Sequence, residues 1–167
     1  LTGIREAKHP VVVTIDADLE NDPANISRLV QALQEGYDVV VAVRPKLPRF
    51  SERLFAVTVG KRIGVTDVLS NFRAMRTDRV KQISLGPWET FGAEFLIRSH
   101  MLGLRIGQVQ VAEGPRRSRP RIGGTLTANV RILKAWVISL IIMLKLGIVG
   151  SPIAKGNPPW LVSPYLG

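Results

Sequence analysis

Two aspartates, Asp16 and Asp18, stand two residues apart, directly after a run of mostly β-branched residues. If the backbone stays extended there, their side chains point to the same side of it. Carboxylate oxygens grouped in this way suit hard divalent cations such as Mg²⁺ and Mn²⁺, which commonly keep open positions for a substrate diphosphate. The spacing alone is a weak signal, because paired aspartates also occur in solvated turns and helix caps. It indicates a metal site only if the surrounding elements present both carboxylates together.

Basic side chains are the second group of residues that could bind a ligand. The chain of 167 residues carries 23 lysines and arginines against 13 acidic residues, a formal net charge of +10. Such an excess favours partners that carry phosphate, whether nucleic acid, anionic lipid or nucleotide. The absence of cysteine excludes disulfides, thiolate zinc sites and a cysteine nucleophile. Any metal must therefore be held by oxygen or by the two histidines, His9 and His100.

The elements around the two aspartates form a β-α-β pattern. Residues 11–15 predict a strand buried on both faces, and residues 38–43 predict a second strand of the same kind. Between them, Asp22 and Pro23 predict a helix start, because Asp caps free N–H groups and Pro is preset for the first turn. Gly36 is placed to end that helix.

The two strands of such a unit are parallel, so both end at the same edge of the sheet. Ligands of open α/β sheets bind at that edge. We therefore expect Asp16, Asp18 and Arg44 to lie near one another. Weaker patterns predict further elements, namely helices at residues 51–62, 77–83 and 90–102 and a strand at residues 105–111.

A long apolar stretch lies near the end of the sequence. Residues 135–144 are apolar apart from Ser139, and a bilayer takes about 20 such residues to cross, so spanning is marginal. We favour an interfacial or re-entrant helix, with Trp136, Arg131 and Lys134 at the level of the lipid headgroups. A core helix of a soluble protein is the alternative.

The order of these features resembles glycosyltransferase family 2, specifically the dolichyl-phosphate mannose synthase group. The likeness covers about residues 11–125 and is carried first by Asp16-Ala-Asp-Leu-Glu-Asn-Asp-Pro23 and Gly36-Tyr-Asp-Val-Val-Val-Ala-Val-Arg44. It implies an α/β fold, a partial GT-A (Rossmann-like) domain with a mostly parallel sheet, followed by an apolar membrane-associated helix. The expected parts are the C-terminal portion of a GT-A catalytic domain at 1–125, the membrane-associated helix at 126–150 and a Pro-rich tail at 151–167.

The resemblance also implies roles on the donor side. Asp16 and Asp18 would hold Mg²⁺ or Mn²⁺ together with the nucleotide-sugar diphosphate, and Glu20, where the family usually has Gln, would be a further metal ligand. Arg121, in the segment Arg121-Ile-Gly-Gly-Thr125, would contact the donor. The expected catalytic residues are Asp16, Asp18, Arg44 and Asp67.

Two more segments carry the likeness. Asp67-Val-Leu-Ser-Asn-Phe-Arg73 matches a family segment that usually has Gly where Asn71 stands, and Thr90-Phe-Gly-Ala-Glu-Phe-Leu96 carries the family's helix glutamate, here Glu94. Val57 occupies the place of a family serine at the acceptor site. The residues expected to bind the acceptor phosphate are Arg44, Arg53, Ser70, Arg73 and Arg119.

The function implied by the resemblance is that of an inverting, metal-dependent glycosyltransferase. It would move a hexose, mannose from GDP-mannose, onto polyprenyl (dolichyl) phosphate at a membrane surface, with the active site on the cytoplasmic face, as in protein glycosylation. No segment like the family's Pro-x-Tyr-Asn-Glu precedes Leu1, so we expect most of the base-binding half to be missing and the isolated chain to be inactive.

Three alternatives stay open at this point. The first is a polyprenyl-phosphate glucosyltransferase, since the sequence does not separate the sugars. The second is a basic nucleic-acid-binding module, but the arginines are not interleaved with aromatic residues and no binding motif is present, so no nucleic-acid partner is expected. The third is a membrane-binding adaptor without enzymatic activity.

Overall fold

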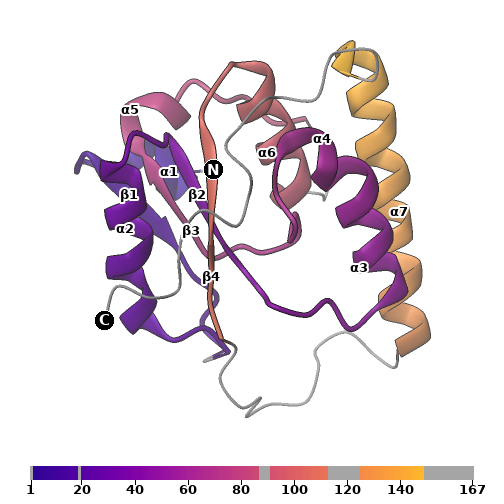
Figure 1. Ribbon diagram of the computed structural model, residues 1–167. Coiled ribbons are helices and arrows are strands. Elements are labelled where there is room, and N and C mark those ends of the chain that lie inside the picture. Colours follow the sequence, from indigo (N-terminus) through magenta and orange to yellow (C-terminus); the bar gives the residue numbers. More distant parts are fainter. Residues whose placement is uncertain (1, 19, 87–90, 113–124, 149–167) are drawn as a thin grey trace.

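The chain is described by a computed structural model at residues 2–18, 20–86, 91–112 and 125–148, which form helices packed on a sheet (Figure 1). Within these residues the sheet has four strands in the order β1-β3-β2-β4. The strands are β1 (Val11–Thr14), β2 (Val39–Val43), β3 (Arg73–Arg76) and β4 (Ile106–Gln110).

Three of the four strands share one direction. β2 and β4 pair in parallel, whereas β3 is antiparallel to both β1 and β2 and lies between them. The expected parallel direction of residues 11–15 and 38–43 is therefore confirmed, but the two strands are not neighbours and the sheet is mixed. The sequence did not predict β3, because its four residues, Arg-Ala-Met-Arg, are too few to show the alternation of apolar and polar residues that marks a strand.

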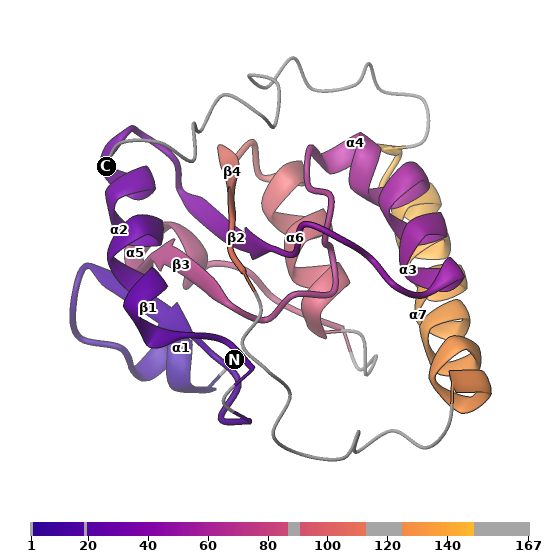
Figure 2. The same ribbon diagram turned by 60° about the horizontal axis from the view of Figure 1, so that its bottom comes forward.

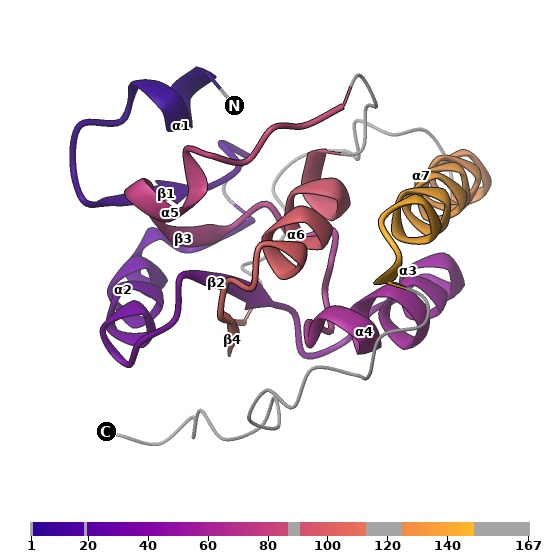
Figure 3. The same ribbon diagram turned by 90° about the horizontal axis from the view of Figure 1, so that it is seen from above.

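Helices cover both faces of the sheet, as the near-continuous valine run of β2 requires. Val39, Val41 and Val43 face a core shared with α6 (Phe91–Met101), while Val40 and Ala42 face α2 (Ile26–Gln34). Figure 3 shows α2 on one side of the sheet and α6 on the other. Two short helices, α1 (Thr2–Glu6) and α5 (Thr77–Val80), complete the end near β1.

The connection after β1 follows the local sequence signals. A short 3-10 turn, η1 (Pro23–Asn25), precedes α2, and the Asp22 carboxylate accepts a hydrogen bond of 2.9 Å from the N–H of Ala24. This confirms the predicted cap. Gly36 follows the helix with a φ of 98°, a conformation that favours glycine.

The helix predicted at residues 51–62 is interrupted. It consists of α3 (Phe50–Phe55), a π-helical turn η2 (Ala56–Gly60) and α4 (Lys61–Ile63). At Gly60 the chain returns so closely that the N–H of Val65 donates to the Gly60 carbonyl at 3.0 Å. A Cβ atom on Gly60 would lie 2.3 Å from the Val65 carbonyl oxygen, so only glycine fits.

The last described helix, α7 (Thr125–Lys145), lies beside α3 and α6 (Figure 2). By length and composition alone, its residues Thr127–Lys145 suffice to cross a membrane, and no other helix in the described part of the chain does. Only 22% of that stretch is buried inside the structure, which leaves most of the helix with an outward surface. The tail predicted at 151–167 lies outside the described residues.

We predict that Gly60→Ala lowers the free energy of unfolding by about 2–3 kcal/mol, because the backbone of η2 must move to relieve the contact with Val65. Urea unfolding of the purified protein measures this. The control is Gly3→Ala in α1, where nothing lies within 4 Å of the added atom. Equal stability of the two variants would show that the close approach at Gly60 is not a constraint.

Candidate active site

Both strands of the β-α-β pattern end at one edge of the sheet. Thr14 of β1 and Val41 of β2 pair with the same residue, Arg73 of β3. Asp16, two residues beyond β1, and Arg44, one residue beyond β2, therefore stand at the same edge, as topology predicts.

The acidic segment at this edge is ordered by its own backbone. Asp16 is exposed, whereas Asp18 and Glu20 are half-buried. The Asp18 carboxylate accepts a hydrogen bond of 3.1 Å from the Glu20 N–H, which closes a short Asx-type turn. This turn holds Asp18 in place beside the end of β1.

Negative charge accumulates around Asp16. Although Asp16 is exposed, the protein atoms that cover part of its carboxylate remove water from it and raise its pKa, and the charges of Asp18 and Glu20 raise this pKa further. A hydrogen bond from the Asn71 side chain and the charge of Arg73 act in the opposite direction and lower the pKa of Asp16. The net result is a carboxylate that a divalent cation would stabilise in its ionised form.

The donor set at this edge fits Mg²⁺ or Mn²⁺ in type, because it consists of carboxylate oxygens. Within the described ranges, no group of three or more His, Asp or Glu side chains has the arrangement of a metal site. The structure thus does not assemble the three protein ligands expected from Asp16, Asp18 and Glu20. Two carboxylates suffice where a substrate diphosphate and water supply the other positions.

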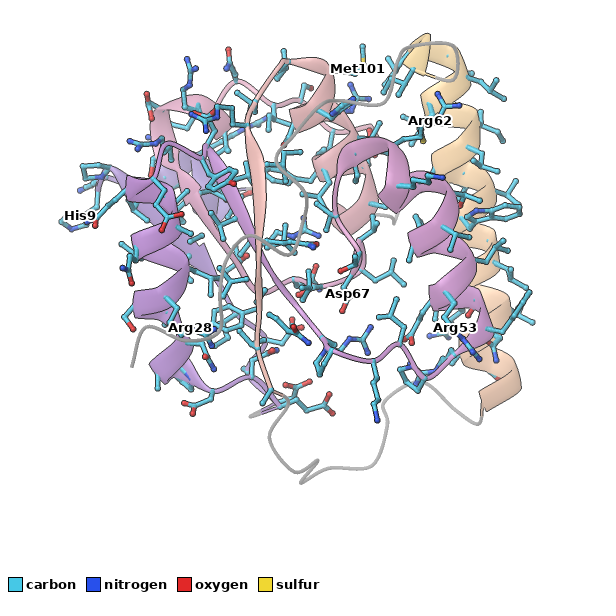
Figure 4. The ribbon with its side chains drawn as sticks, in the orientation of Figure 1. His9, Arg28, Arg53, Arg62, Asp67 and Met101 are labelled. Atoms are coloured by element: carbon cyan, nitrogen blue, oxygen red, sulfur yellow. The ribbon has the colours of Figure 1, made fainter. Side chains whose placement is uncertain are left out.

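Arg44 is held by a buried partner. Its Nε and one Nη donate to the two carboxylate oxygens of Asp67 at 2.6 and 3.2 Å, a two-pronged pair. Asp67 is only 2% exposed and lies between the sheet and α3, as Figure 4 shows. The sequence singled out both residues but not their pairing.

A second buried carboxylate, Glu52, joins the pair from α3. Its Oε1 lies 3.4 Å from Arg44 and 2.7 Å from Arg49, and its Oε2 accepts from the Arg49 N–H at 3.2 Å. Sequence reasoning missed Glu52. The available signal was a glutamate at the third helical position, the place of the acid in a capping box, but Arg49 stands where that motif has Ser or Thr.

Arg73 lies inside the protein rather than on its surface. It is 1% exposed, its Nε donates to the Ser70 carbonyl at 2.8 Å and one Nη donates to the Val68 carbonyl at 3.2 Å. The guanidinium also lies 5.6 Å from the centre of the Phe95 ring. The prediction that Arg73 binds an acceptor phosphate is therefore not supported by its position, because a buried side chain bonded to backbone carbonyls does not reach a substrate.

The burial of Arg73 gives the edge an internal positive charge. Burial lowers the pKa of Arg73 to about 10, and the nearby Asp67 and Asp16 oppose this shift. The loop that it supports reaches β1, since the Thr14 hydroxyl donates to the Asn71 carbonyl at 2.7 Å. Arg73 thus connects the two acidic parts of the edge.

The other predicted residues fall in different surroundings. Arg53 is exposed on α3 (Figure 4), and Ser70 is half-buried, where its hydroxyl accepts from the Phe72 N–H at 3.4 Å. Glu94 is fully buried, and its Oε1 accepts from the Gly86 N–H and from Arg98. These bonds tie α6 to the chain at Gly86.

Arg119 and Arg121 lie outside the described residues. The histidines stay poor candidates for a base. His9 lies far from Asp67 in Figure 4, and His100 lies in the last turn of α6, where burial lowers its pKa.

We predict that Asp67→Asn lowers the free energy of unfolding by about 2–3 kcal/mol, because Arg44 and the buried Arg73 lose a nearby negative charge that balances them. Thermal or urea unfolding measures this. Asp78→Asn serves as the control, because Asp78 is exposed on α5. A cost for Asp67→Asn no larger than that of the control would contradict the pairing.

Comparison with known proteins places these features in one family. Residues 1–89 match the model of glycosyl transferase family 2. The undecaprenyl-phosphate 4-deoxy-4-formamido-L-arabinose transferase of Pseudomonas savastanoi pv. phaseolicola is 39% identical over 70 residues, which are 39% of this chain and 21% of that protein. The protein of the same name from Aeromonas hydrophila subsp. hydrophila is 50% identical over 44 residues, 26% of this chain and 14% of that protein.

Solved structures agree on the fold. Glucosyl-3-phosphoglycerate synthase of Mycobacterium tuberculosis, in complex with Mn²⁺, UDP-glucose and phosphoglyceric acid, matches with a TM-score of 0.65 at 22% identity over 96% of this chain and 63% of that chain. The chain spans about a fifth of the length of the curated relatives it matches, 21% for the Pseudomonas protein. The α/β architecture is that of the GT-A fold. Since the family model covers more than half of its residues, the chain belongs to glycosyl transferase family 2.

Proposed function

We propose that this chain forms the catalytic edge of an enzyme that transfers a sugar from a nucleotide onto the phosphate of a polyprenyl lipid. The observation that carries the proposal is the meeting, at one sheet edge, of the acidic segment and the Arg44–Asp67 pair in a member of this family. The names of the relatives support a polyprenyl-phosphate acceptor.

The donor side is assigned to the acidic segment. Asp16 and Asp18 would hold Mg²⁺ or Mn²⁺, with Glu20 close enough to add charge. When bound, such an ion neutralises the diphosphate as it leaves the sugar. Asn71 orients Asp16 through its hydrogen bond, and Arg121 is proposed as a further contact to the donor.

The acceptor side needs cations rather than a base. A phosphate oxygen is already ionised near neutral pH, so positioning suffices. This oxygen forms a bond to the anomeric carbon while the bond from that carbon to the donor diphosphate breaks, and the electron pair leaves with the diphosphate. Such a single displacement inverts the configuration at that carbon.

Arg44 is the proposed anchor for the acceptor phosphate, because Asp67 and Glu52 fix its guanidinium before any substrate arrives. Arg53, Ser70 and Arg119 are proposed as additional contacts. Asp67 acts by positioning Arg44 and does not touch the substrate.

The sugar is a separate part of the proposal. The resemblance implies mannose from GDP-mannose and dolichyl phosphate, with the site on the cytoplasmic face of a membrane and a place in protein glycosylation. The names of the relatives mention undecaprenyl phosphate in place of dolichyl phosphate, and a formamido-arabinose in place of mannose. Both share a polyprenyl phosphate, and GDP-mannose is our proposed donor.

A panel of substrates tests this function. The purified full-length protein that contains this chain is assayed with GDP-mannose, UDP-glucose and a nucleotide-activated formamido-arabinose, each with dolichyl phosphate, undecaprenyl phosphate and the corresponding free polyprenols. We expect transfer from GDP-mannose to the phosphates, with inverted configuration in the product, and none to the alcohols. Transfer from another donor alone would correct the sugar, and no transfer to any polyprenyl phosphate would refute the proposal.

For the metal, we predict that Asp16→Asn or Asp18→Asn lowers the kcat of the full-length protein at least about 100-fold, because the leaving diphosphate is no longer neutralised. Chelation should abolish activity and Mn²⁺ should restore it. The matched control is Asp22→Asn, which keeps a good helix cap and should change kcat less than about twofold. Wild-type turnover by Asp16→Asn would rule out the assigned metal site.

A further inference from the structure

A buried glutamine in β4 is bonded to the residue that precedes Asp67. Gln108 is 9% exposed, and its side-chain oxygen accepts hydrogen bonds from the Thr66 N–H at 2.9 Å and from the Thr66 hydroxyl at 3.1 Å. A polar side chain inside a sheet costs free energy unless it is hydrogen-bonded. Here both donors belong to one residue of a distant segment, so the two bonds tie β4 to the chain beside Asp67.

The segment 65–67 is bonded at each of its three residues to a different part of the fold. The first residue bonds to η2, the second to β4 and the third to the arginine that follows β2. The bonds run from the Val65 N–H to the Gly60 carbonyl at 3.0 Å, from the Thr66 N–H to Gln108 at 2.9 Å, and from the Arg44 Nε to Asp67 at 2.6 Å. The chain therefore reaches Asp67 along a path that η2 and β4 have already fixed.

The peptide group between Val65 and Thr66 is restrained on both of its sides. Its carbonyl oxygen lies so close to Gly60 that a Cβ atom there would clash with it, and its N–H donates to Gln108. The buried Val65 side chain holds the segment against the core, but apolar contacts have no preferred direction. The hydrogen bond to Gln108 thus fixes how this peptide is turned, and with it the direction in which the chain enters Asp67.

The register of the sheet explains how a residue of β4 can act on the end of β2. The two strands pair in parallel, and Gln108 stands opposite Val41, whose side chain lies in the same core as that of Val65. Paired residues of neighbouring strands point to the same face of a sheet. Arg44 follows Val41 by three residues, so the link from Gln108 through Asp67 to Arg44 spans two neighbouring strands.

We infer that Gln108 is a positioning residue for the acceptor site. It fixes Asp67 through Thr66, and Asp67 fixes the Arg44 guanidinium that is proposed to bind the acceptor phosphate. This inference deepens the proposed function and rests on it for the identity of the acceptor. Because Gln108 is buried, it acts on the substrate only through these residues.

The first test is the steady-state kinetics of the full-length protein that contains this chain, with GDP-mannose and dolichyl phosphate as substrates. Gln108→Leu keeps the site filled but accepts no hydrogen bond, so we expect the KM for dolichyl phosphate to rise about tenfold as Arg44 loses its fixed place. The KM for GDP-mannose should change less than about twofold, because Arg73 holds the rest of the loop separately at the Val68 and Ser70 carbonyls.

The strand supplies a matched control. Gln110→Leu makes the same change at an exposed position of β4 and should keep both KM values within about twofold of wild type. Gln108→Glu retains an accepting oxygen at the same side-chain length and should return the KM for dolichyl phosphate to within about threefold. A loss of folded protein would lower the rate and leave both KM values as they were, so this split separates positioning from stability.

A spectroscopic arm observes Arg44 without any substrate. In the full-length protein labelled with ¹⁵N-arginine, the Arg44 Nε–H should exchange slowly with solvent, because it is bonded to the buried Asp67. Arg44→Lys identifies the signal by removing it. Gln108→Leu should speed this exchange about tenfold or more, and Gln108→Glu and Gln110→Leu should leave it as in wild type.

Thr66→Val is a milder variant that keeps the inference testable if Gln108→Leu does not fold. Thr66 is exposed, and the substitution removes the hydroxyl bond to Gln108 while the backbone bond remains. We expect the KM for dolichyl phosphate to rise about twofold to threefold and the Arg44 Nε–H to exchange faster by a similar factor. Wild-type values of both quantities in Thr66→Val would then count against the link.

Two results would overturn the inference: a KM for dolichyl phosphate that is the same in Gln108→Leu and Gln110→Leu, or an Arg44 Nε–H that exchanges equally slowly in both. The two arms also separate this inference from the proposed function. Sugar transfer by the wild type, with Arg44 unaffected by Gln108→Leu, refutes only the inference. An Arg44 signal that responds to Gln108→Leu, in a protein that transfers no sugar to any polyprenyl phosphate, refutes only the proposed function.

Discussion

The two-pronged bond between Arg44 and the buried Asp67 is the interaction on which the sheet edge depends. It joins the end of β2 to the loop that leads into β3, and Glu52 extends it to α3. Charges this far from water are stable only when each has partners, so loss of one member affects the others. The charged side chains of this edge, Arg44, Asp67 and Glu52, are consequently held in position by one another.

At this edge, the acidic part is proposed to bind the donor and the basic part is proposed to bind the acceptor. The carboxylates after β1 suit a cation and a diphosphate, whereas the guanidinium after β2 suits a phosphate. Arg73 lies beneath both, too deep to bind a substrate, and its charge faces Asp16 and Asp67.

The sequence predicted what depends on local signals. The cap at Asp22, the glycine ending at Gly36 and the shared direction of β1 and β2 follow from residue types and spacing over a few turns. The antiparallel insertion of β3, the burial of Arg73 and the part played by Glu52 were not predictable in this way. Each depends on pairing between segments far apart in the chain, which four residues or a single charged side chain do not reveal.

The central claim is that Asp16 and Asp18 together bind one divalent ion at the sheet edge. Anomalous diffraction from crystals grown with Mn²⁺ and a nucleoside diphosphate tests it most directly. The account predicts one Mn²⁺ peak about 2.0–2.3 Å from a carboxylate oxygen of each aspartate and in contact with the diphosphate. A peak bound elsewhere, or a diphosphate bound at another edge of the sheet without these two residues, would contradict it.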